Sequence, residues 1–244
     1  LRESFVRKGV SVSSIIANTL PNTFVLALTS MSFALVLGIS FGLVCALYEH
    51  KFIDQFLSST AVFGMALPSF FSAIIIAWLF GYVYQKHTGL SMTGSLYAVD
   101  DYGSGETLIL KNLVLPAFTL GIRPLAVVLQ LTRNSILDTL QEDYIRTARA
   151  KGLSNFRVLI FHALPNALNP VITAASGWLA SMLAGAVFVE FIFGWNGIGK
   201  EIVYALDYLD LPLVMGAVLT LSICFVFITI FTDILYYILD PRIK

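Results

Sequence analysis

The amino-acid sequence predicts an all-α, polytopic membrane helix bundle. Hydrophobic residues fill 57% of the 244 positions and charged residues only 12%, and the mean hydropathy is +0.83. Long windows also contain no charged side chain. A chain of this composition does not have water as its only solvent. We therefore expect one transmembrane domain over residues 1–244.

Charge-free windows define four of the expected membrane spans. Asp, Glu, Lys and Arg are absent from residues 9–48, 55–85, 158–189 and 211–232. Each window holds the roughly 20 apolar residues needed to cross hydrocarbon. A fifth apolar stretch, at 113–132, is interrupted only by Arg123 and Gln130. The sequence thus predicts five helices, at about 22–47, 56–84, 112–133, 166–189 and 211–236.

Basic residues orient the five spans. If the polar stretch after the third span is cytoplasmic, eight Lys and Arg residues lie inside and six outside, as the positive-inside rule favours. The outer loops, at about 86–111 and 190–210, are too short for a soluble catalytic or nucleotide-binding domain. A net charge of zero gives no general attraction to nucleic acid.

Small residues recur every four positions in two of the predicted spans. In membranes such ridges let helix backbones approach closely, so we interpret them as packing surfaces, with a sliding interface during transport as the alternative. The two ridges are Ser30, Ala34, Gly38, Gly42 and Ala46, and Thr173, Gly177, Ser181 and Gly185. Pro68 and Pro116 can kink their helices, either structurally or as part of a transport mechanism.

Three charged residues lie within or at the ends of spans. Arg123 stands mid-span beside Pro124, where a cation costs about 2.5–3.5 kcal/mol on insertion scales. It should face the bundle interior, pair with an acid or line a watery path. Glu190 closes the fourth span and Asp233 lies near the inner end of the last. We take Arg123 and Glu190 as candidates for a translocation path, with structural roles as the alternative.

Enzymatic sites are not indicated. The segment GWNGIGK (194–200) matches the start of a phosphate-binding loop, but Glu201 replaces the required Ser or Thr, so we interpret it as a glycine-rich turn. His50, His87 and His162 are far apart in the sequence and belong to no nucleophile–base or metal-ligand pattern. We expect no catalytic residue, metal site or cofactor on this chain.

The most polar segment, DYIRTARAKGLSNFRVLIFHALP (143–165), predicts two helical limbs around a glycine corner. Residues 136–150 form an amphipathic pattern that continues out of the third span. Gly152 can adopt the left-handed turn that ends a helix. Ser154 can cap a second limb, which runs to about Ala163 before Pro165 opens the next span. This shape suits docking into a groove of another protein.

Three motifs carry a resemblance to a known family. The segment YIRTARAKGL, followed by His162 to Pro165, is similar to the EAA loop of ATP-binding-cassette (ABC) importer permeases. Ala148, Gly152, Leu164 and Pro165 match its register, whereas Arg146, Thr147 and His162 depart from it. VEFIFGWNGIGK and the ending DILYYILDPRIK resemble two further segments of the dipeptide, oligopeptide and nickel subfamily. The resemblance covers the chain from about Val12 onward.

The resemblance implies a type I ABC importer permease fold. The first helix of the family is not matched and the chain begins with Leu1, so we expect a fragment holding five of six spans. Residues 136–165 would form the cytoplasmic coupling loop. Its opening stretch would dock on an ATPase subunit through Tyr144, Arg146, Thr147, Ala148, Arg149, Ala150, Lys151, Gly152 and Leu153.

The same resemblance implies a function and a set of partners. The chain would form half of a peptide path that works by alternating access, in a bacterial cytoplasmic (inner) membrane. Two ATPase subunits would carry ATP and Mg, a second homologous permease would complete the path, and a periplasmic or lipoprotein binding protein would deliver the substrate. Nickel or another small solute is the alternative cargo. An ion-coupled secondary transporter is a more distant alternative, because it predicts inverted repeats that we do not find.

Overall fold

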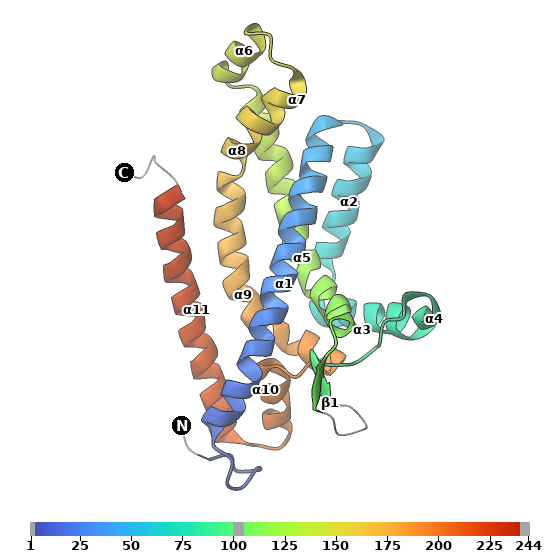
Figure 1. The fold of residues 1–244 in the computed structure, drawn as a ribbon, viewed down its shortest axis with the longest axis vertical. Coiled ribbons are helices and arrows are strands. Elements are labelled where there is room, and N and C mark those ends of the chain that lie inside the picture. Colours follow the sequence, from blue (N-terminus) through green and yellow to red (C-terminus); the bar gives the residue numbers. More distant parts are fainter. Residues whose placement is uncertain (1–2, 100–104, 240–244) are drawn as a thin grey trace. The chain divides into compact units, whose positions relative to one another are not determined.

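The computed structural model describes residues 3–99 and 105–239, and these form helices almost throughout (Figure 1). The predicted all-α membrane bundle is confirmed, with one small β-hairpin added. The long helices are α1 (Val12–Leu47), α5 (Lys111–Leu140), α9 (Asn169–Phe193) and α11 (Leu211–Leu239). The first half of the chain also holds α2 (Phe52–Ala66), α3 (Ser69–Trp78), the π-helical η1 (Leu79–Val83) and α4 (Gln85–Thr88).

Short elements complete the second half of the chain. They are α6 (Asp143–Ala150), α7 (Asn155–Arg157), the π-helical η2 (Val158–Ala163), α8 (Leu164–Ala167) and α10 (Ile198–Asp207). In the hairpin, β1 (Tyr97–Val99) pairs antiparallel with β2 (Glu106–Leu108). The predicted outer-loop residues Asp100 and Asp101, the side chain of Asp233 and the last five residues of the C-terminal motif lie outside the described residues.

By length and composition, three described helices can cross a membrane: α1, α5 and α11. Two helix pairs interrupted by short breaks bring the number to as many as five. The single helix predicted for 56–84 is wrong, because α2 ends at Ala66 and α3 begins at Ser69. Pro68 explains the break: it offers no N–H and disfavours helical geometry at Leu67. By contrast, α5 continues through Pro116.

The chain divides into two compact units, each described by itself. The first comprises Leu1–Ser30, Leu67–Gly121 and Leu179–Ile228, and the second comprises Met31–Ala66, Ile122–Trp178 and Thr229–Lys244. In the first unit, one apolar cluster joins the start of α1 to α10 and to the start of α11. Its buried members are Val12, Ile15, Ile16, Ile198, Ile202, Ala205, Leu213 and Ala217.

The N-terminal segment of the first unit is tied to the connection between α10 and α11. Asp210 is fully buried there and accepts hydrogen bonds from the Ser4 hydroxyl, from the N–H of Phe5 at 3.1 Å and from the N–H of Leu213 at 3.4 Å. Burial alone would raise the pKa of Asp210, but these hydrogen bonds hold it below its ordinary value. The carboxylate therefore caps the first turn of α11.

In the second unit, α1 and α5 pack through the predicted small-residue ridge. A Cβ placed on Gly38 would lie 2.7 Å from Val128 Cγ1, and one on Gly42 would lie 2.6 Å from Thr132 Cβ and 2.7 Å from the Leu129 carbonyl oxygen. The ridge on α9 is different, since a Cβ on Gly177 would meet no described atom within 4 Å. Close packing is thus confirmed for α1 at these two glycines.

We predict that Gly42→Ala destabilises the purified chain by about 1–3 kcal/mol, because the backbone carbonyl of Leu129 cannot move aside as a side chain could. Gly177→Ala is the matched control and should leave stability unchanged or slightly higher, since alanine favours helix. Thermal unfolding in detergent compares the two. Equal midpoints for both variants would show that the close approach of α1 and α5 is not required.

Candidate functional site

The polar loop of the second unit begins with α6, whose apolar face is buried. Ile145 is fully buried and Ala148 nearly so. They pack in one cluster that joins α1, α5, η2 and α8. The buried members of this loop anchor are Ala46, Ile136, Ile145, Ala148, Val158, Leu159, Ala163 and Ala167. The loop is therefore held to the ends of two long helices.

The sequence prediction of one continuous helix over 136–150 is wrong. Helix α5 ends at Leu140, and α6 begins at Asp143 after Glu142 takes an extended conformation (φ −68°, ψ 148°). After the break, Ile145 and Ala148 face the anchor, whereas Tyr144 is 42% exposed. The prediction from hydrophobic periodicity required one straight helix axis through residues 136–150, and no Gly or Pro in the sequence marks the break.

The predicted glycine corner is confirmed. Gly152 has φ +79°, in the left-handed region that other residues enter only at a cost. Its N–H donates to the carbonyl of Arg149 at 2.9 Å, and the N–H of Leu153 donates to the carbonyl of Ala148 at 3.4 Å. These two bonds form a Schellman motif. Leu153 also packs against the loop anchor, so the corner is fixed on its apolar side.

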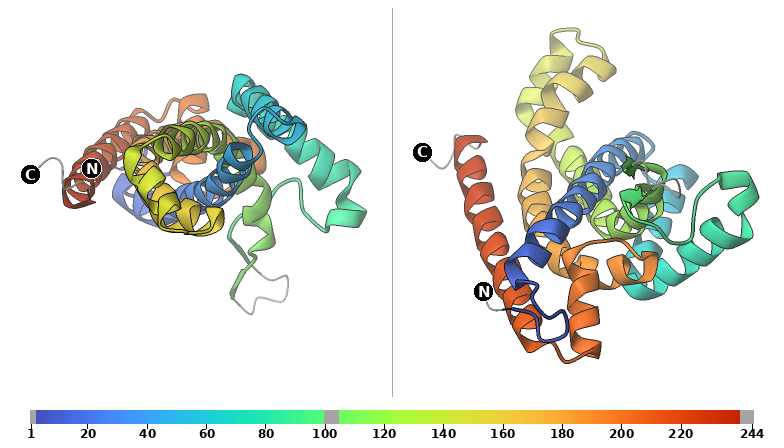
Figure 2. Two further views of the ribbon diagram at one scale, coloured as in Figure 1. Left: turned by 90° about the horizontal axis from the view of Figure 1, so that it is seen from above. Right: turned by 60° about the horizontal axis from the view of Figure 1, so that its bottom comes forward.

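The second limb follows as predicted. The Ser154 hydroxyl accepts from the N–H of Arg157 at 3.4 Å and so caps α7, which runs on into η2. The side-chain amide of Asn166 donates to the Tyr144 hydroxyl at 2.9 Å and links α8 to α6. Figure 2 shows α6 beside this second limb in both views. The loop is thus a bonded hairpin of helices.

Seven of the nine predicted docking residues are exposed: Tyr144, Arg146, Thr147, Arg149, Ala150, Lys151 and Gly152. Ala148 belongs to the loop anchor and Leu153 is half-buried, so these two support the surface from within. Sequence reasoning missed Phe156, which is 70% exposed at the start of the second limb. A phenylalanine inside an otherwise polar run was the available signal. We call the seven exposed residues plus Phe156 the docking surface.

Glu190 lies in the first unit and holds the start of α10. Its side chain is fully buried, and Oε2 accepts from the N–H of Gly199 at 2.7 Å and of Lys200 at 3.2 Å. A carboxylate at a helix N-terminus satisfies donors that have no partner within the helix. The path-lining role of Glu190 stays a prediction, and its described contacts are those of an anchor for α10.

The segment 194–200 forms the glycine-rich turn that the sequence predicts. Gly194 has φ +65°, and Gly197 precedes α10 with extended geometry. The buried Trp195 donates from its indole N–H to the carbonyl of Asn22 at 3.0 Å, and the N–H of Ile198 donates to the Thr23 hydroxyl at 2.9 Å. The turn therefore fastens α10 to α1 within the first unit.

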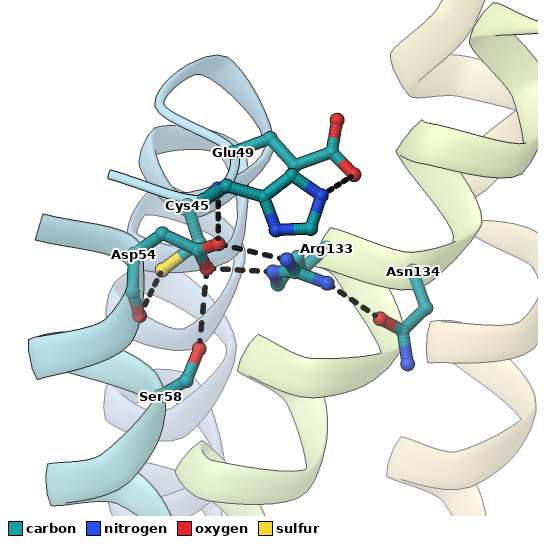
Figure 3. A network of polar contacts seen from close by, with 7 residues as sticks. Cys45, Glu49, Asp54, Ser58, Arg133 and Asn134 are labelled. Atoms are coloured by element: carbon teal, nitrogen blue, oxygen red, sulfur yellow. Dashed lines mark hydrogen bonds and ion pairs between the residues drawn. The ribbon is translucent and has the colours of Figure 1, made fainter. Parts of the chain in front are cut away.

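Arginine side chains of α5 differ sharply in their surroundings. Arg123 is exposed, and no ion pair or hydrogen bond joins it to any residue that the structure describes. Arg133 instead grips the buried Asp54 of α2 with two bonds: Nε to Oδ1 at 2.6 Å and Nη2 to Oδ2 at 2.7 Å (Figure 3). Sequence reasoning missed this pair, although opposite charges stand at neighbouring ends of two predicted spans.

The described residues contain no candidate metal site. No group of three or more His, Cys, Asp or Glu side chains within residues 3–99 and 105–239 is placed to hold an ion. The arrangement instead offers a docking surface on a packed anchor, together with helices that can cross a membrane.

Known proteins are similar to this chain in sequence and in fold. Residues 38–244 match the family described as binding-protein-dependent transport system inner membrane component. The oligopeptide transport system permease protein AppB of Bacillus subtilis (strain 168) is 38% identical over 242 residues, 99% of this chain and 75% of the relative. The dipeptide transport system permease protein DppB of Escherichia coli (strain K12) is 34% identical over 238 residues, 91% of this chain and 70% of the relative.

A solved structure of the MetNI methionine ABC transporter in an inward-facing conformation matches with a TM-score of 0.72. The match covers 94% of this chain and 98% of that chain at 15% identity, so it shows the fold alone. The fold is the all-α membrane helix bundle of the type I ABC importer permeases. The chain belongs to the family of binding-protein-dependent transport system inner membrane components, in its dipeptide, oligopeptide and nickel subfamily.

We predict that Glu190→Ala lowers stability by about 1–3 kcal/mol, because two buried N–H groups at the start of α10 lose their acceptor. Glu190→Gln keeps a carbonyl oxygen and should lose less. Thermal unfolding and proteolysis within 194–200 report the effect. An alanine variant as stable and as protease-resistant as the unaltered chain would contradict the anchoring role.

Proposed function

We propose that this chain is the permease subunit of a peptide importer, driven by ATP that partner subunits hydrolyse. The docking surface carries the proposal, because exposed arginine, lysine and aromatic side chains cover a loop whose other face is packed against membrane helices. The names of the relatives, an oligopeptide and a dipeptide permease, favour peptides as cargo.

The loop anchor supplies the mechanical step. Two ATPase subunits, each holding ATP and Mg, would close on the docking surface of this chain and on that of a second homologous permease. Because Ile145 and Ala148 are packed against Ile136 of α5 and Ala46 of α1, a displaced α6 carries those helix ends with it. The path would then alternate between inward-facing and outward-facing states.

Peptide would enter from the opposite side of the membrane. A periplasmic or lipoprotein binding protein would deliver it at the segments that follow α3 and α9, in a bacterial inner membrane. Arg123, an exposed mid-helix cation without a partner among the described residues, would line the path. The chain itself would bind neither ATP nor a metal cofactor.

The proposal predicts that Arg149→Glu uncouples transport. Reversing the charge at an exposed position of the docking surface should weaken the ATPase contact and lower ATP-driven peptide uptake at least tenfold, a loss of about 1.4 kcal/mol. The assembled importer in proteoliposomes provides uptake, and affinity purification provides the amount of ATPase subunit retained. The thermal midpoint should not change, since the side chain is exposed.

Lys8→Glu is the matched control, because Lys8 is also exposed but precedes α1, outside the docking surface and outside the segments proposed to receive the binding protein. It should leave both uptake and ATPase binding intact. If the importer carrying Arg149→Glu binds its ATPase subunits and transports peptide normally, the assignment of the docking surface is wrong.

A further inference from the structure

A polar groove between α2 and α5 has no part in the coupling scheme. It lies in the second unit, has a volume of about 400 Å³ and opens beside the Asp54–Arg133 pair drawn in Figure 3. Neutral polar side chains dominate its walls, namely Gln55, Ser58 and Ser59 from α2 and Gln130 and Asn134 from α5.

Helix α2 separates two environments. Ser58 faces the groove, whereas Ile53 and Phe56 are 42% and 57% exposed and belong to the other side of the helix. Phe56 stands two residues before Ser58, which is about 200° around the helix axis. Apolar side chains suit lipid, while polar ones in a membrane segment are expensive unless they meet water or a polar partner. The groove side of α2 is therefore built for a wet or occupied space.

Charge in the groove wall is neutralised. The two bonds between Arg133 and Asp54 are 2.6 and 2.7 Å long, and the N–H of His50 also donates to Asp54 at 3.0 Å. A carboxylate held this way keeps no strong attraction for cations. The groove thus offers hydrogen bonds without a fixed net charge.

Arg123, which has no bonded partner among the residues that the structure describes, lies on the groove side of α5. It precedes Gln130 by seven residues and Asn134 by eleven, so all three fall on one helical stripe. Seven residues correspond to about 10 Å along the axis. The Arg123 guanidinium is therefore attached about two helical turns from Gln130, nearer the middle of α5.

We infer that this groove is a binding station for the backbone of a peptide in transit, an inference that rests on the proposed peptide transport. The amides of Gln55, Gln130 and Asn134 would pair with peptide N–H and C=O groups whatever the peptide side chains are. Arg123 would attract the terminal carboxylate. Within the groove itself the peptide backbone would be held by several weak hydrogen bonds, which allow a substrate both to enter and to leave.

Photocrosslinking tests the station directly. A diazirine-bearing residue is placed at Ser59, or at Thr60 as the matched neighbour on the lipid side of α2, in the complete importer in proteoliposomes. The probe is a radiolabelled peptide chosen from a panel of two to five residues for uptake by the unaltered importer. We expect at least fivefold more labelled permease from position 59 than from position 60 during ATP-driven turnover.

A substitution pair tests the same surface by transport. Ser58→Leu fills the groove and removes the long hydrogen bond from the Ser58 hydroxyl to Asp54 at 3.4 Å, but neither of the two Arg133–Asp54 bonds involves Ser58. Uptake should therefore fall at least fivefold while the ATPase subunits stay bound. Thr60→Leu makes the same kind of polar-to-leucine change on the opposite side of the helix and should transport normally.

The outcomes separate the inference from the proposed function. Equal labelling at positions 59 and 60, crosslinks to the second permease in place of peptide, or full uptake with Ser58→Leu would each overturn the binding station while peptide transport stands. If the unaltered importer takes up no peptide of the panel, the proposed function itself fails, and the station with it.

Discussion

The burial of Ile145 and Ala148 is the contact on which the rest of the second unit depends. Both side chains come from a helix of only eight residues, which has too few internal hydrogen bonds to be stable alone. The apolar cluster that they share with the ends of α1 and α5 keeps α6 folded and fixes its orientation. One face of α6 is thereby committed to the membrane helices, and the other is left for a partner.

Backbone geometry makes this arrangement stiff. The left-handed Gly152 and the two hydrogen bonds at this turn hold the corner, and the hydrogen bond between Asn166 and Tyr144 joins the two limbs. At Gly38 and Gly42, α1 lies so close to α5 that a larger side chain at either position would clash. A stiff loop on closely packed helices transmits displacement. The proposed importer requires this, because its ATPase subunits would act on the loop and not on the membrane helices directly.

The sequence predicted the features that depend on local composition. Charge-free windows located α1 and α11, and the apolar stretch around Arg123 located α5. Gly152 and Ser154 marked the corner because each has a specific backbone role. Features that depend on tertiary pairing escaped prediction. The Asp54–Arg133 pair joins residues 79 positions apart, and the break before Asp143 has no Gly or Pro to announce it. Helix α10 was expected only as part of a loop, since its fold depends on the buried carboxylate of Glu190.

In the proposed importer the loop anchor carries motion from the docking surface to the helices, and peptide uptake by an Ile145→Ala variant measures that role. The substitution leaves a cavity in the anchor but changes no exposed side chain. We expect the variant importer to bind its ATPase subunits and hydrolyse ATP, yet to take up peptide at less than a tenth of the normal rate, with Ile145→Val affected much less. If peptide uptake stays coupled to ATP hydrolysis in Ile145→Ala, the loop anchor does not transmit the motion.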